Sequence, residues 1–211
     1  MNTTFLKSFR HAACMVAAGV VCATSPKAQA ADNSLLWDGL HPTEWGSQII
    51  AMAFNDEIGS SGNDSTNVSD LVVCIGDSIT AGYGATGYPA YLETMSGKTC
   101  VNAGIGGSKS DSGATRVRSL LYSYKPKYLC ILYGANDVIN GKAVSFTVEN
   151  LRFMCDSAVN GQTCPLLATL TPMSGTKYGK YSAKVQELNQ KIRNMAVTYG
   201  YKLIDLESEF E

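Results

Sequence analysis

The sequence is short of histidine and carries no excess of either charge. Its 211 residues include 17 Lys and Arg, 18 Asp and Glu and only two histidines, so the formal net charge at pH 7 is −1. The basic stripe that nucleic-acid binding requires is missing. Apart from the N-terminal segment, the chain has no run of about 18 apolar residues, the length that spans a membrane. We therefore expect no nucleic-acid partner and no membrane span.

Motifs for metals and cofactors are also missing. None of the seven cysteines forms a CxxC pair or a Cys/His cluster, the arrangements that hold zinc. The glycines at 104, 106 and 107 have a Gly-x-Gly-Gly spacing, which matches neither the dinucleotide motif G-x-G-x-x-G nor a phosphate loop. We expect an activity that needs no metal and no cofactor.

Residues 1–30 have the features of a secretory signal peptide. Two basic residues precede an apolar stretch at 12–23, and Ala28-Gln29-Ala30 supplies the small residues of a cleavage site. A membrane anchor is the less favoured alternative, because the stretch is short and rich in alanine. We expect cleavage after Ala30 and export to the periplasm or the medium, which leaves 31–211, a length typical of one domain.

Five cysteines lie beyond this signal. Cys74, Cys100 and Cys130 fall in predicted strands, where a buried cysteine acts as a small apolar residue. Cys155 and Cys164 flank a polar loop, and an oxidising compartment permits a disulfide between them. Because sequence does not determine cysteine connectivity, the bonded and the free states both remain open.

From residue 71 onwards, short apolar segments alternate with amphipathic ones. This alternation is typical of an α/β protein in which helices cover both faces of a parallel sheet. The predicted strands are 71–75, 99–102, 128–133, 166–170 and 202–206. The predicted helices between them are 88–95, 114–124, 146–159 and 181–199.

Two segments precede this alternation. Trp45, Ile49 and Phe54 recur at helical spacing and predict a helix over 43–58 with one buried face. Residues 59–70 have no apolar periodicity and are rich in Gly, Ser, Asn and Asp. We expect them to form a flexible polar linker between that helix and the first strand.

The first predicted strand of the sheet runs into Gly76-Asp77-Ser78. In open α/β sheets, ligands bind outside the carboxyl ends of the strands, so Ser78 lies where a nucleophile would act. The same tripeptide is also an ordinary turn sequence, and the second glycine of the G-x-S-x-G motif is missing. Taken alone, the stretch favours a turn and a catalytic serine about equally.

Asp38 and His41 lie three residues apart in a turn before the predicted N-terminal helix. This spacing allows the carboxylate to orient the imidazole and to stabilise its charged form, as the third member of a triad does. An acid in a turn and a surface histidine would give the same pattern. However, the second histidine, His11, belongs to the expected signal peptide, so a histidine base would have to be His41.

Two further polar loops follow strands and are expected at the same edge of the sheet as Ser78. They carry Gly107 and Asn136. Acyl transfer requires donors directed at the developing oxyanion, and the backbone N–H groups of Ser78 and Gly107 and the amide of Asn136 would be three such donors. Each residue alone is compatible with a tight turn, but their conjunction with Asp38 and His41 favours catalysis.

Four sequence blocks together resemble the SGNH hydrolases, also called GDSL esterases and lipases. The blocks are Asp38-Gly39-Leu40-His41-Pro42, Gly76-Asp77-Ser78, residues 102–107 and Gly134-Ala135-Asn136-Asp137. The resemblance covers nearly all of residues 32–206. It implies a three-layer α/β/α sandwich with a flavodoxin-like, five-stranded parallel sheet. It also implies a catalytic triad of Ser78, His41 and Asp38, and an oxyanion hole made by Ser78, Gly107 and Asn136.

The order of the blocks departs from the family pattern. The D-x-x-H block and its helix usually follow the last strand, whereas here they come first. The resemblance therefore implies a circular permutation, in which 59–70 joins the family's usual last helix to its first strand. Such permutations are tolerated because chain ends often lie close together at a domain surface. We expect Leu35, Leu36 and Trp37 to hold the D-x-x-H block in place by packing.

The resemblance further implies a serine esterase that forms an acyl-enzyme on Ser78. The sequence contains no candidate lid or long apolar insertion, so we expect a short acyl group such as acetyl, on a small-molecule or carbohydrate alcohol. Tyr83, Tyr88, Tyr133 and Tyr178 are candidates for lining the site, although half-buried packing is the more common role of tyrosine. An acyltransferase acting on a carbohydrate is an alternative. A carbohydrate-binding module without activity is less favoured, because all members of the triad are present.

Overall fold

The computed structural model describes residues 34–58 and 67–211, and the segment from Ser34 to Glu211 forms one compact unit. The expected signal peptide at 1–30 and most of the expected linker, 59–66, lie outside the described residues. Within the described ranges, no helix combines the length and the apolar character that crossing a membrane requires.

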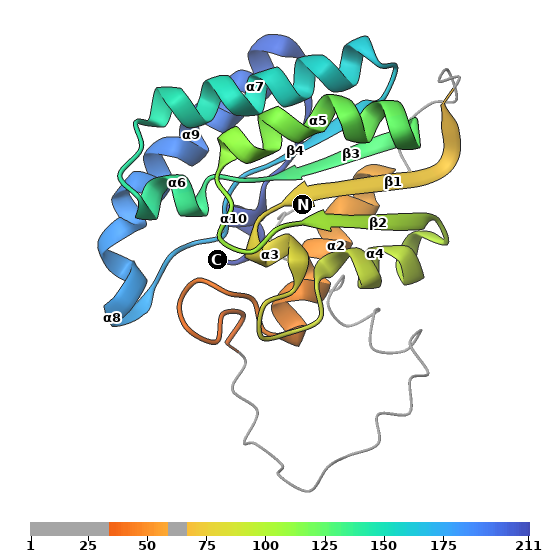
Figure 1. The fold of residues 1–211 in the computed structure, drawn as a ribbon. Helices are drawn as coiled ribbons and strands as arrows, with labels where there is room; N and C mark the ends of the chain where they lie inside the picture. The colour runs from red at the N-terminus through yellow and green to blue at the C-terminus, as the bar shows by residue number, and fades with distance from the viewer. Residues whose placement is uncertain (1–33, 59–66) are drawn as a thin grey trace, which may run out of the picture. The chain divides into compact units, whose positions relative to one another are not determined.

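A five-stranded parallel sheet lies at the centre of this unit (Figure 1). Its strands are β1 (Val68–Gly76), β2 (Thr99–Gly104), β3 (Pro126–Leu132), β4 (Cys164–Ala168) and β5 (Lys202–Ile204). They are ordered β2-β1-β3-β4-β5, and Val73 in β1 lies opposite Val101 in β2 and Leu129 in β3. This is the strand order of flavodoxin-like folds, so the predicted fold class is confirmed.

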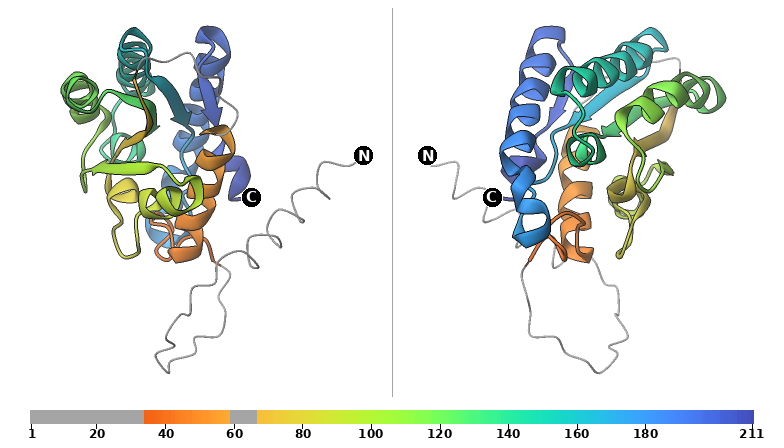
Figure 2. Two further views of the ribbon diagram at one scale, coloured as in Figure 1. Left: turned by 90° about the vertical axis from the view of Figure 1, so that its right-hand side faces the viewer. Right: turned by 60° about the vertical axis from the view of Figure 1, so that its left-hand side comes forward.

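Helices cover both faces of the sheet. The longer ones are α2 (Glu44–Ile58), α4 (Tyr88–Ser96), α5 (Ser110–Tyr124), α7 (Val144–Asn160) and α9 (Ser182–Tyr199). On one face α7 packs between α5 and α9, and on the other α2 packs against α4 (Figures 1 and 2). The helix α2 also contacts β5, although it precedes β1 in the chain.

Burial on both faces explains the composition of the strands. All seven residues of β3 are buried, and Val72 to Ile75 of β1 are completely inaccessible to solvent. Parallel sheets covered by helices on both sides have such continuous apolar runs rather than an alternating pattern. The long helix α9 buries Val185, Leu188 and Ile192, which recur every three or four residues along one face.

In the part of the chain that the structure describes, five short helical segments follow strands or loops and were not predicted. They are α3 (Ser78–Ala81), α6 (Ala135–Ile139), α8 (Gly175–Tyr178), α10 (Leu206–Glu209) and the 3₁₀ helix η1 (Gly179–Tyr181). Each has five residues or fewer, too short for apolar periodicity to be visible in the sequence.

The expected linker is shorter than predicted, because β1 begins at Val68 and not at residue 71. The side-chain amide of Asn67 donates hydrogen bonds to the carbonyl oxygens of Pro126 and Gly161 and to the hydroxyl of Thr163. These bonds fix the entry to β1 beside β3. A polar side chain therefore anchors the strand where composition alone indicated a loop.

The disulfide considered for Cys155 and Cys164 is not formed, since neither residue is disulfide-bonded. The helix α7 continues to Asn160, so Cys155 lies within the helix, on its fully buried face, and not at the edge of a loop. Cys164 begins β4 opposite Tyr128 of β3. Cys74 and Cys130 are buried in neighbouring strands, as predicted, whereas Cys100 in β2 is only partly buried.

A buried amide holds the segment that leaves β4. The side chain of Asn189 on α9 accepts a hydrogen bond from the N–H of Leu170 at 2.8 Å and donates one to its carbonyl oxygen at 3.0 Å. Asn189 is completely buried. It therefore takes the place of a strand partner for a backbone residue that has just left the sheet.

We expect Asn189→Ala to lower the free energy of unfolding by about 2–4 kcal/mol, because two buried backbone groups lose their partners. The neighbouring exposed variant Gln190→Ala provides the control and should change it by less than about 0.5 kcal/mol. Urea unfolding of both variants measures the difference. Equal stabilities for the two variants would contradict the role assigned to Asn189.

Candidate active site

The site is built where β1 and β2 end at the carboxyl edge of the sheet. Ser78 is the first residue of α3, two residues after β1, and it is largely buried. A Cβ atom on Gly76 would lie 1.9 Å from the Thr80 hydroxyl oxygen, and one on Gly104 would lie 2.3 Å from the backbone nitrogen of Ala81. Only glycine at both positions allows α3 to pack so closely against the strand ends.

Asp38 and His41 lie in a tight turn before α2. The Asp38 carboxylate accepts hydrogen bonds from the N–H groups of Leu40 at 3.0 Å and His41 at 2.7 Å. Its second oxygen lies 2.9 Å from Nδ1 of His41. Gly39 adopts a φ of +86°, which a glycine tolerates without strain. The turn therefore holds the carboxylate and the imidazole in one orientation.

The two segments meet across 37 residues of sequence. Nε2 of His41 lies 3.0 Å from Oγ of Ser78, which completes a hydrogen-bonded series from Asp38 through His41 to Ser78. Burial acts to raise the pKa of Asp38, but the hydrogen bonds from His41 and Leu40 outweigh it, so this pKa lies below its usual value. Asp38 is therefore an anion at neutral pH.

Aromatic rings enclose the imidazole. The ring of His41 lies 5.8 Å from that of Trp37 and 4.8 Å from that of Tyr83. Gly84 packs so closely on the indole that a Cβ atom there would lie 2.8 Å from the Trp37 ring. These contacts restrict the positions that the His41 side chain can occupy.

Backbone pairing also ties down the segment that carries the D-x-x-H block. Leu36 and Pro42 form an antiparallel bridge, and the N–H of Thr43 donates to the carbonyl oxygen of Leu35 at 3.0 Å. Leu35 and Leu36 are only half-buried, and Trp37 is 50% exposed. The expectation of a segment held by side-chain packing is thus only partly met, because the backbone supplies much of the attachment.

The two other predicted donors lie near Ser78. Gly107 follows β2 with a φ of +72°, and Asn136 lies in α6, directly after β3. The Asn136 amide donates to the carbonyl oxygen of Ser108 at 3.1 Å and, at the longer distance of 3.3 Å, to the carboxyl group of Asp77. Ser78, Gly107 and Asn136 all line the same cavity.

Two buried carboxyl groups support these loops, and the sequence interpretation assigned neither a role. Asp77 accepts from the N–H of Ile79 at 2.9 Å, and Asp137 accepts from the N–H and hydroxyl groups of Ser110 at 2.9 and 2.6 Å. Burial raises the pKa of Asp77 to about 7, and the nearby Asp137 adds to this increase. The hydrogen bonds that Asp77 accepts from Ile79 and Asn136 act in the opposite direction but are outweighed. Asp77 directly precedes Ser78 and Asp137 directly follows Asn136, and this adjacency is the feature of the sequence that could have indicated their supporting role.

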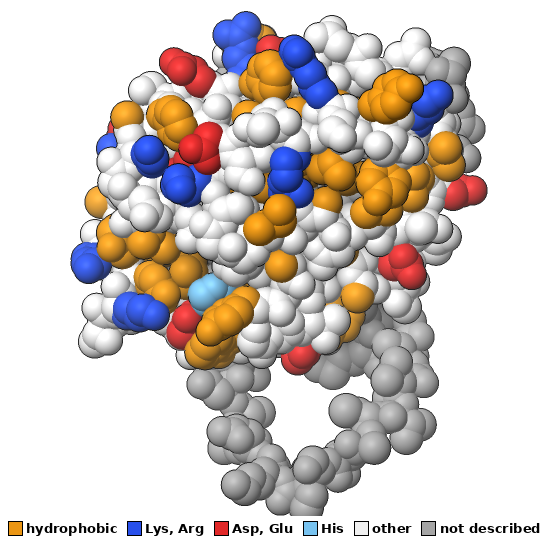
Figure 3. Space-filling view, in the orientation of Figure 1, with side chains coloured by type: hydrophobic (Ala, Val, Ile, Leu, Met, Phe, Trp, Pro, Cys, Tyr) orange, Lys and Arg blue, Asp and Glu red, His pale blue; other side chains and the backbone are white. Residues whose placement is uncertain are grey.

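A cavity of about 650 Å³ opens over Ser78 and His41. In Figure 3 the pale-blue histidine lies at the surface among orange side chains, with blue basic side chains nearby. Among the tyrosines considered, Tyr83 and Tyr178 line this cavity, whereas Tyr88 and Tyr133 are completely buried in the core. Lys177 and Lys180 also line it and were not predicted, although their neighbour Tyr178 was a candidate for the lining.

Comparison with known proteins identifies several similar chains. The model of the GDSL-like Lipase/Acylhydrolase family matches residues 74–211. The chain is 31% identical over 104 residues to the Escherichia coli K12 protein named thioesterase 1/protease 1/lysophospholipase L1. The aligned stretch covers 47% of this chain and 50% of that protein. The chain thus spans about half the length of the curated relatives that it matches.

Two solved structures extend the comparison. The esterase AlinE4, described as an SGNH-hydrolase family member, is 25% identical with a TM-score of 0.54, covering 68% of this chain and 77% of that one. A GDSL-like lipase from Bacteroides thetaiotaomicron VPI-5482 has a TM-score of 0.58 at 21% identity, covering 75% and 78% of the two chains. The second likeness concerns the fold alone.

The family match begins at residue 74, so Asp38 and His41 lie outside it. The circular permutation inferred from the order of the blocks stays a prediction. The contact of α2 with β5 and α10 is what that prediction requires, since in the family order this helix would follow the last strand.

The protonation of Asp77 predicts a pH-dependent stability. An unfolded aspartate has a pKa of about 4, whereas that of folded Asp77 is about 7, so the folded state binds more protons between these values. The stability contributed by protonated Asp77 is complete below about pH 4 and is lost as the pH rises towards 7. Relative to Asp77→Asn, the wild-type free energy of unfolding should fall by up to about 1.4 kcal/mol per pH unit over this range.

Urea unfolding at pH 4, 5, 6 and 7 measures this slope. Asp70→Asn, which removes an exposed carboxylate, serves as the control and should keep the wild-type slope. If Asp77→Asn and the wild type showed the same pH dependence, the proton assigned to Asp77 would be wrong.

Proposed function

Because the chain belongs to the GDSL-like lipase/acylhydrolase family, we propose that it is a serine ester hydrolase with Ser78, His41 and Asp38 as its catalytic triad. The observation that carries the proposal is the unbroken hydrogen-bonded series at the floor of an open cavity. Its two contacts are 3.0 Å from Ser78 Oγ to His41 Nε2 and 2.9 Å from His41 Nδ1 to Asp38. A nucleophile, a base and a group that orients the base are the elements required for acyl transfer.

The first half of the reaction forms an acyl-enzyme. His41 Nε2 takes the proton from Ser78 Oγ as this oxygen attacks the ester carbonyl carbon. Asp38, an anion held by three hydrogen bonds, keeps the proton on Nδ1 and stabilises the imidazolium. When the tetrahedral intermediate collapses, His41 donates the proton that it took from Ser78 to the leaving alcohol oxygen, and the acyl group stays on Ser78.

The second half releases the acyl group. Water gives a proton to His41 and attacks the acyl carbon, and the proton then returns to Ser78. One ester and one water yield one acid and one alcohol. In both halves the negative oxygen needs donors, for which we propose the N–H groups of Ser78 and Gly107 and the Asn136 amide. The 3.3 Å contact from Asn136 to Asp77 is the weaker of the two bonds of that amide, and we propose that it is exchanged for the oxyanion.

We propose a short acyl group, such as acetyl, on a small-molecule or carbohydrate alcohol. The open cavity has room for an alcohol of the size of one or two sugar rings. Transfer of the acyl group to a carbohydrate hydroxyl instead of water is the alternative outcome of the same acyl-enzyme. Product analysis with and without a sugar acceptor distinguishes the two.

The first test is hydrolysis of p-nitrophenyl esters, from acetate to long-chain esters, by the wild type and Ser78→Ala. We expect that the wild type hydrolyses the acetate and that the variant does not, because Ser78 Oγ is the hydroxyl in contact with Nε2 of His41. Preference for long chains would contradict the short acyl group. Absence of hydrolysis with every ester, by folded protein, would contradict the proposed function.

Asn136→Ala tests the oxyanion hole. Loss of one oxyanion donor typically lowers kcat by about 10²–10³, and we expect a decrease of this size with little change in KM. Asn194→Ala removes an exposed asparagine from α9 and should leave the rate unchanged. Circular dichroism verifies that both variants are folded. A rate within about threefold of the wild type would remove Asn136 from the oxyanion hole.

A further inference from the structure

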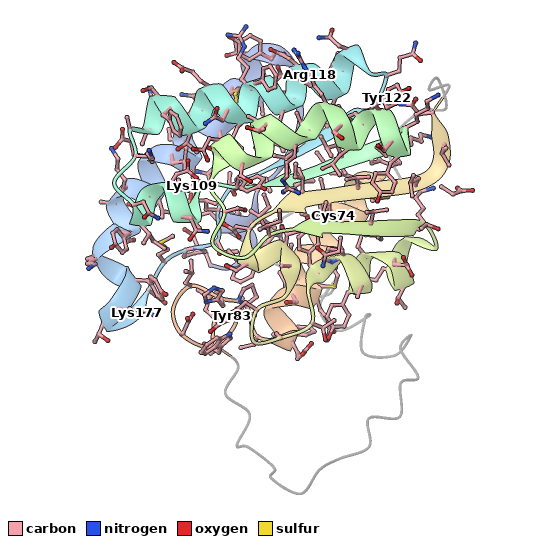
Figure 4. All side chains as sticks on the ribbon, in the orientation of Figure 1. Cys74, Tyr83, Lys109, Arg118, Tyr122 and Lys177 are labelled. Carbon is pink, nitrogen blue, oxygen red and sulfur yellow. The ribbon has the colours of Figure 1, made fainter. Side chains whose placement is uncertain are left out.

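Two lysines stand at the mouth of the cavity, on the chain segment between β4 and α9. Lys177 lies in α8 and Lys180 in η1, and both line the same cavity as Ser78 and His41. Figure 4 shows Lys177 on one side of the loop that carries Asp38 and His41, with Tyr83 on the other. The ammonium groups lie over the rings of Tyr178 and Tyr181, at 4.7 and 5.0 Å from the ring centroids.

These lysines are available to a ligand. Both side chains are exposed, and neither forms an ion pair within the described part of the chain. The Tyr178 hydroxyl and, more weakly, Asp38 raise the pKa of Lys177, so it carries its charge at neutral pH. The contacts with the tyrosine rings favour positions of the two ammonium groups beside the cavity lining.

Among the described residues that line the cavity, one carboxylate faces two ammonium groups, so it offsets only part of their charge. This carboxylate is that of Asp38, whose oxygens are already bonded to His41 and Leu40. Glu44, at the start of α2, is turned away towards Thr86 and Tyr91, from which it accepts hydrogen bonds. The mouth of the cavity is therefore positive.

The lysines lie on the side where the alcohol part of an ester would leave. The N–H of Ser174, just before α8, donates to the carbonyl oxygen of Gly39 at 2.9 Å, which joins this segment to the turn that carries His41. A histidine base protonates the leaving oxygen, so the alcohol lies on the His41 side of Ser78. The proposed oxyanion groups lie elsewhere, Gly107 in the loop after β2 and Asn136 in α6, which follows β3.

The opposite wall is aromatic. Trp37 is 50% exposed and Tyr83 is 61% exposed, with ring centroids 6.2 Å apart. Large aromatic surfaces that remain in contact with water beside a catalytic group favour a ligand with a flat apolar face. The cavity thus offers a ring-binding wall and a cationic wall to the same part of a substrate.

We propose that the enzyme selects esters whose leaving alcohol carries a negative group, a carboxylate or a phosphate, which Lys177 and Lys180 bind while Trp37 and Tyr83 contact the ring or chain of the alcohol. This inference rests on the proposed function, since it concerns the substrate of that site. It makes the two lysines specificity-determining residues that take no part in the chemistry.

The test compares 4-acetoxybenzoate with its neutral methyl ester, methyl 4-acetoxybenzoate, in the wild type and in Lys177→Met/Lys180→Met. An exposed ion pair changes a binding constant by up to about fivefold, so the double variant should lower kcat/KM for 4-acetoxybenzoate about tenfold, mainly through KM. For the methyl ester we expect a change of less than about twofold. High salt should reduce the wild-type kcat/KM for 4-acetoxybenzoate and leave that for the methyl ester unchanged.

A parallel series with 4-acetoxyphenyl phosphate establishes whether removing the lysines affects hydrolysis of the carboxylate or of the phosphate substrate more strongly.

The matched control is Lys184→Met/Lys191→Met, which removes the same charge from the separate groove that both residues line beside α7, and it should leave all three substrates unaffected. Equal effects of the cavity double variant on the anionic and neutral esters would overturn this inference while leaving the esterase intact. An equal response to the control double variant would also overturn it, because net charge alone would then explain the effect. If the wild type hydrolysed none of the esters, the proposed function would fall, and this inference with it.

Discussion

The close approach of α3 to the ends of β1 and β2 is the constraint on which the site depends. A side chain on Gly76 would collide with Thr80, and one on Gly104 would collide with Ala81. With glycine at both positions, the chain turns directly from a buried strand into a short helix, so Ser78 reaches the edge of the sheet after only two residues. The same turn buries Asp77, whose carboxyl group then has to be satisfied by Ile79 and Asn136.

Burial and hydrogen bonding give three aspartates near one serine different properties. Asp38 is partly exposed, receives N–H donors and stays ionised, which is what a histidine base requires. Asp77 is enclosed and close to Asp137, and its pKa is raised towards neutrality. Asp137 connects α6 to the first turn of α5 through Ser110 and so holds the loop that contains Gly107. The negative charge next to His41 is therefore retained, while the charge directly beside Ser78 is reduced.

Much of this arrangement could be predicted, because the pattern of apolar segments reports the strands and long helices, and short polar blocks follow the strand ends. The predictions failed where a contact distant in sequence decides the outcome. Asn67 reaches Pro126 and Gly161, which extends β1 into the expected linker. Whether Cys155 and Cys164 are bonded was left open by the sequence, and the structure places Cys155 on the buried face of α7 without a disulfide. Sequence could not separate Tyr83, at the cavity, from Tyr88, in the core.

The sequence by itself determined the fold class and limited the candidates for a catalytic triad. The periodicity of its apolar residues requires a buried parallel sheet, and with a single histidine beyond the expected signal, a histidine base had to be His41. Only the tertiary structure decided how these groups act together: the 3.0 Å contact between His41 and Ser78, the aromatic rings around the imidazole, and the positive mouth made by Lys177 and Lys180. The periodicity of apolar residues is a local property of the chain. The direction of a loop side chain depends instead on its contacts with residues of other helices and strands.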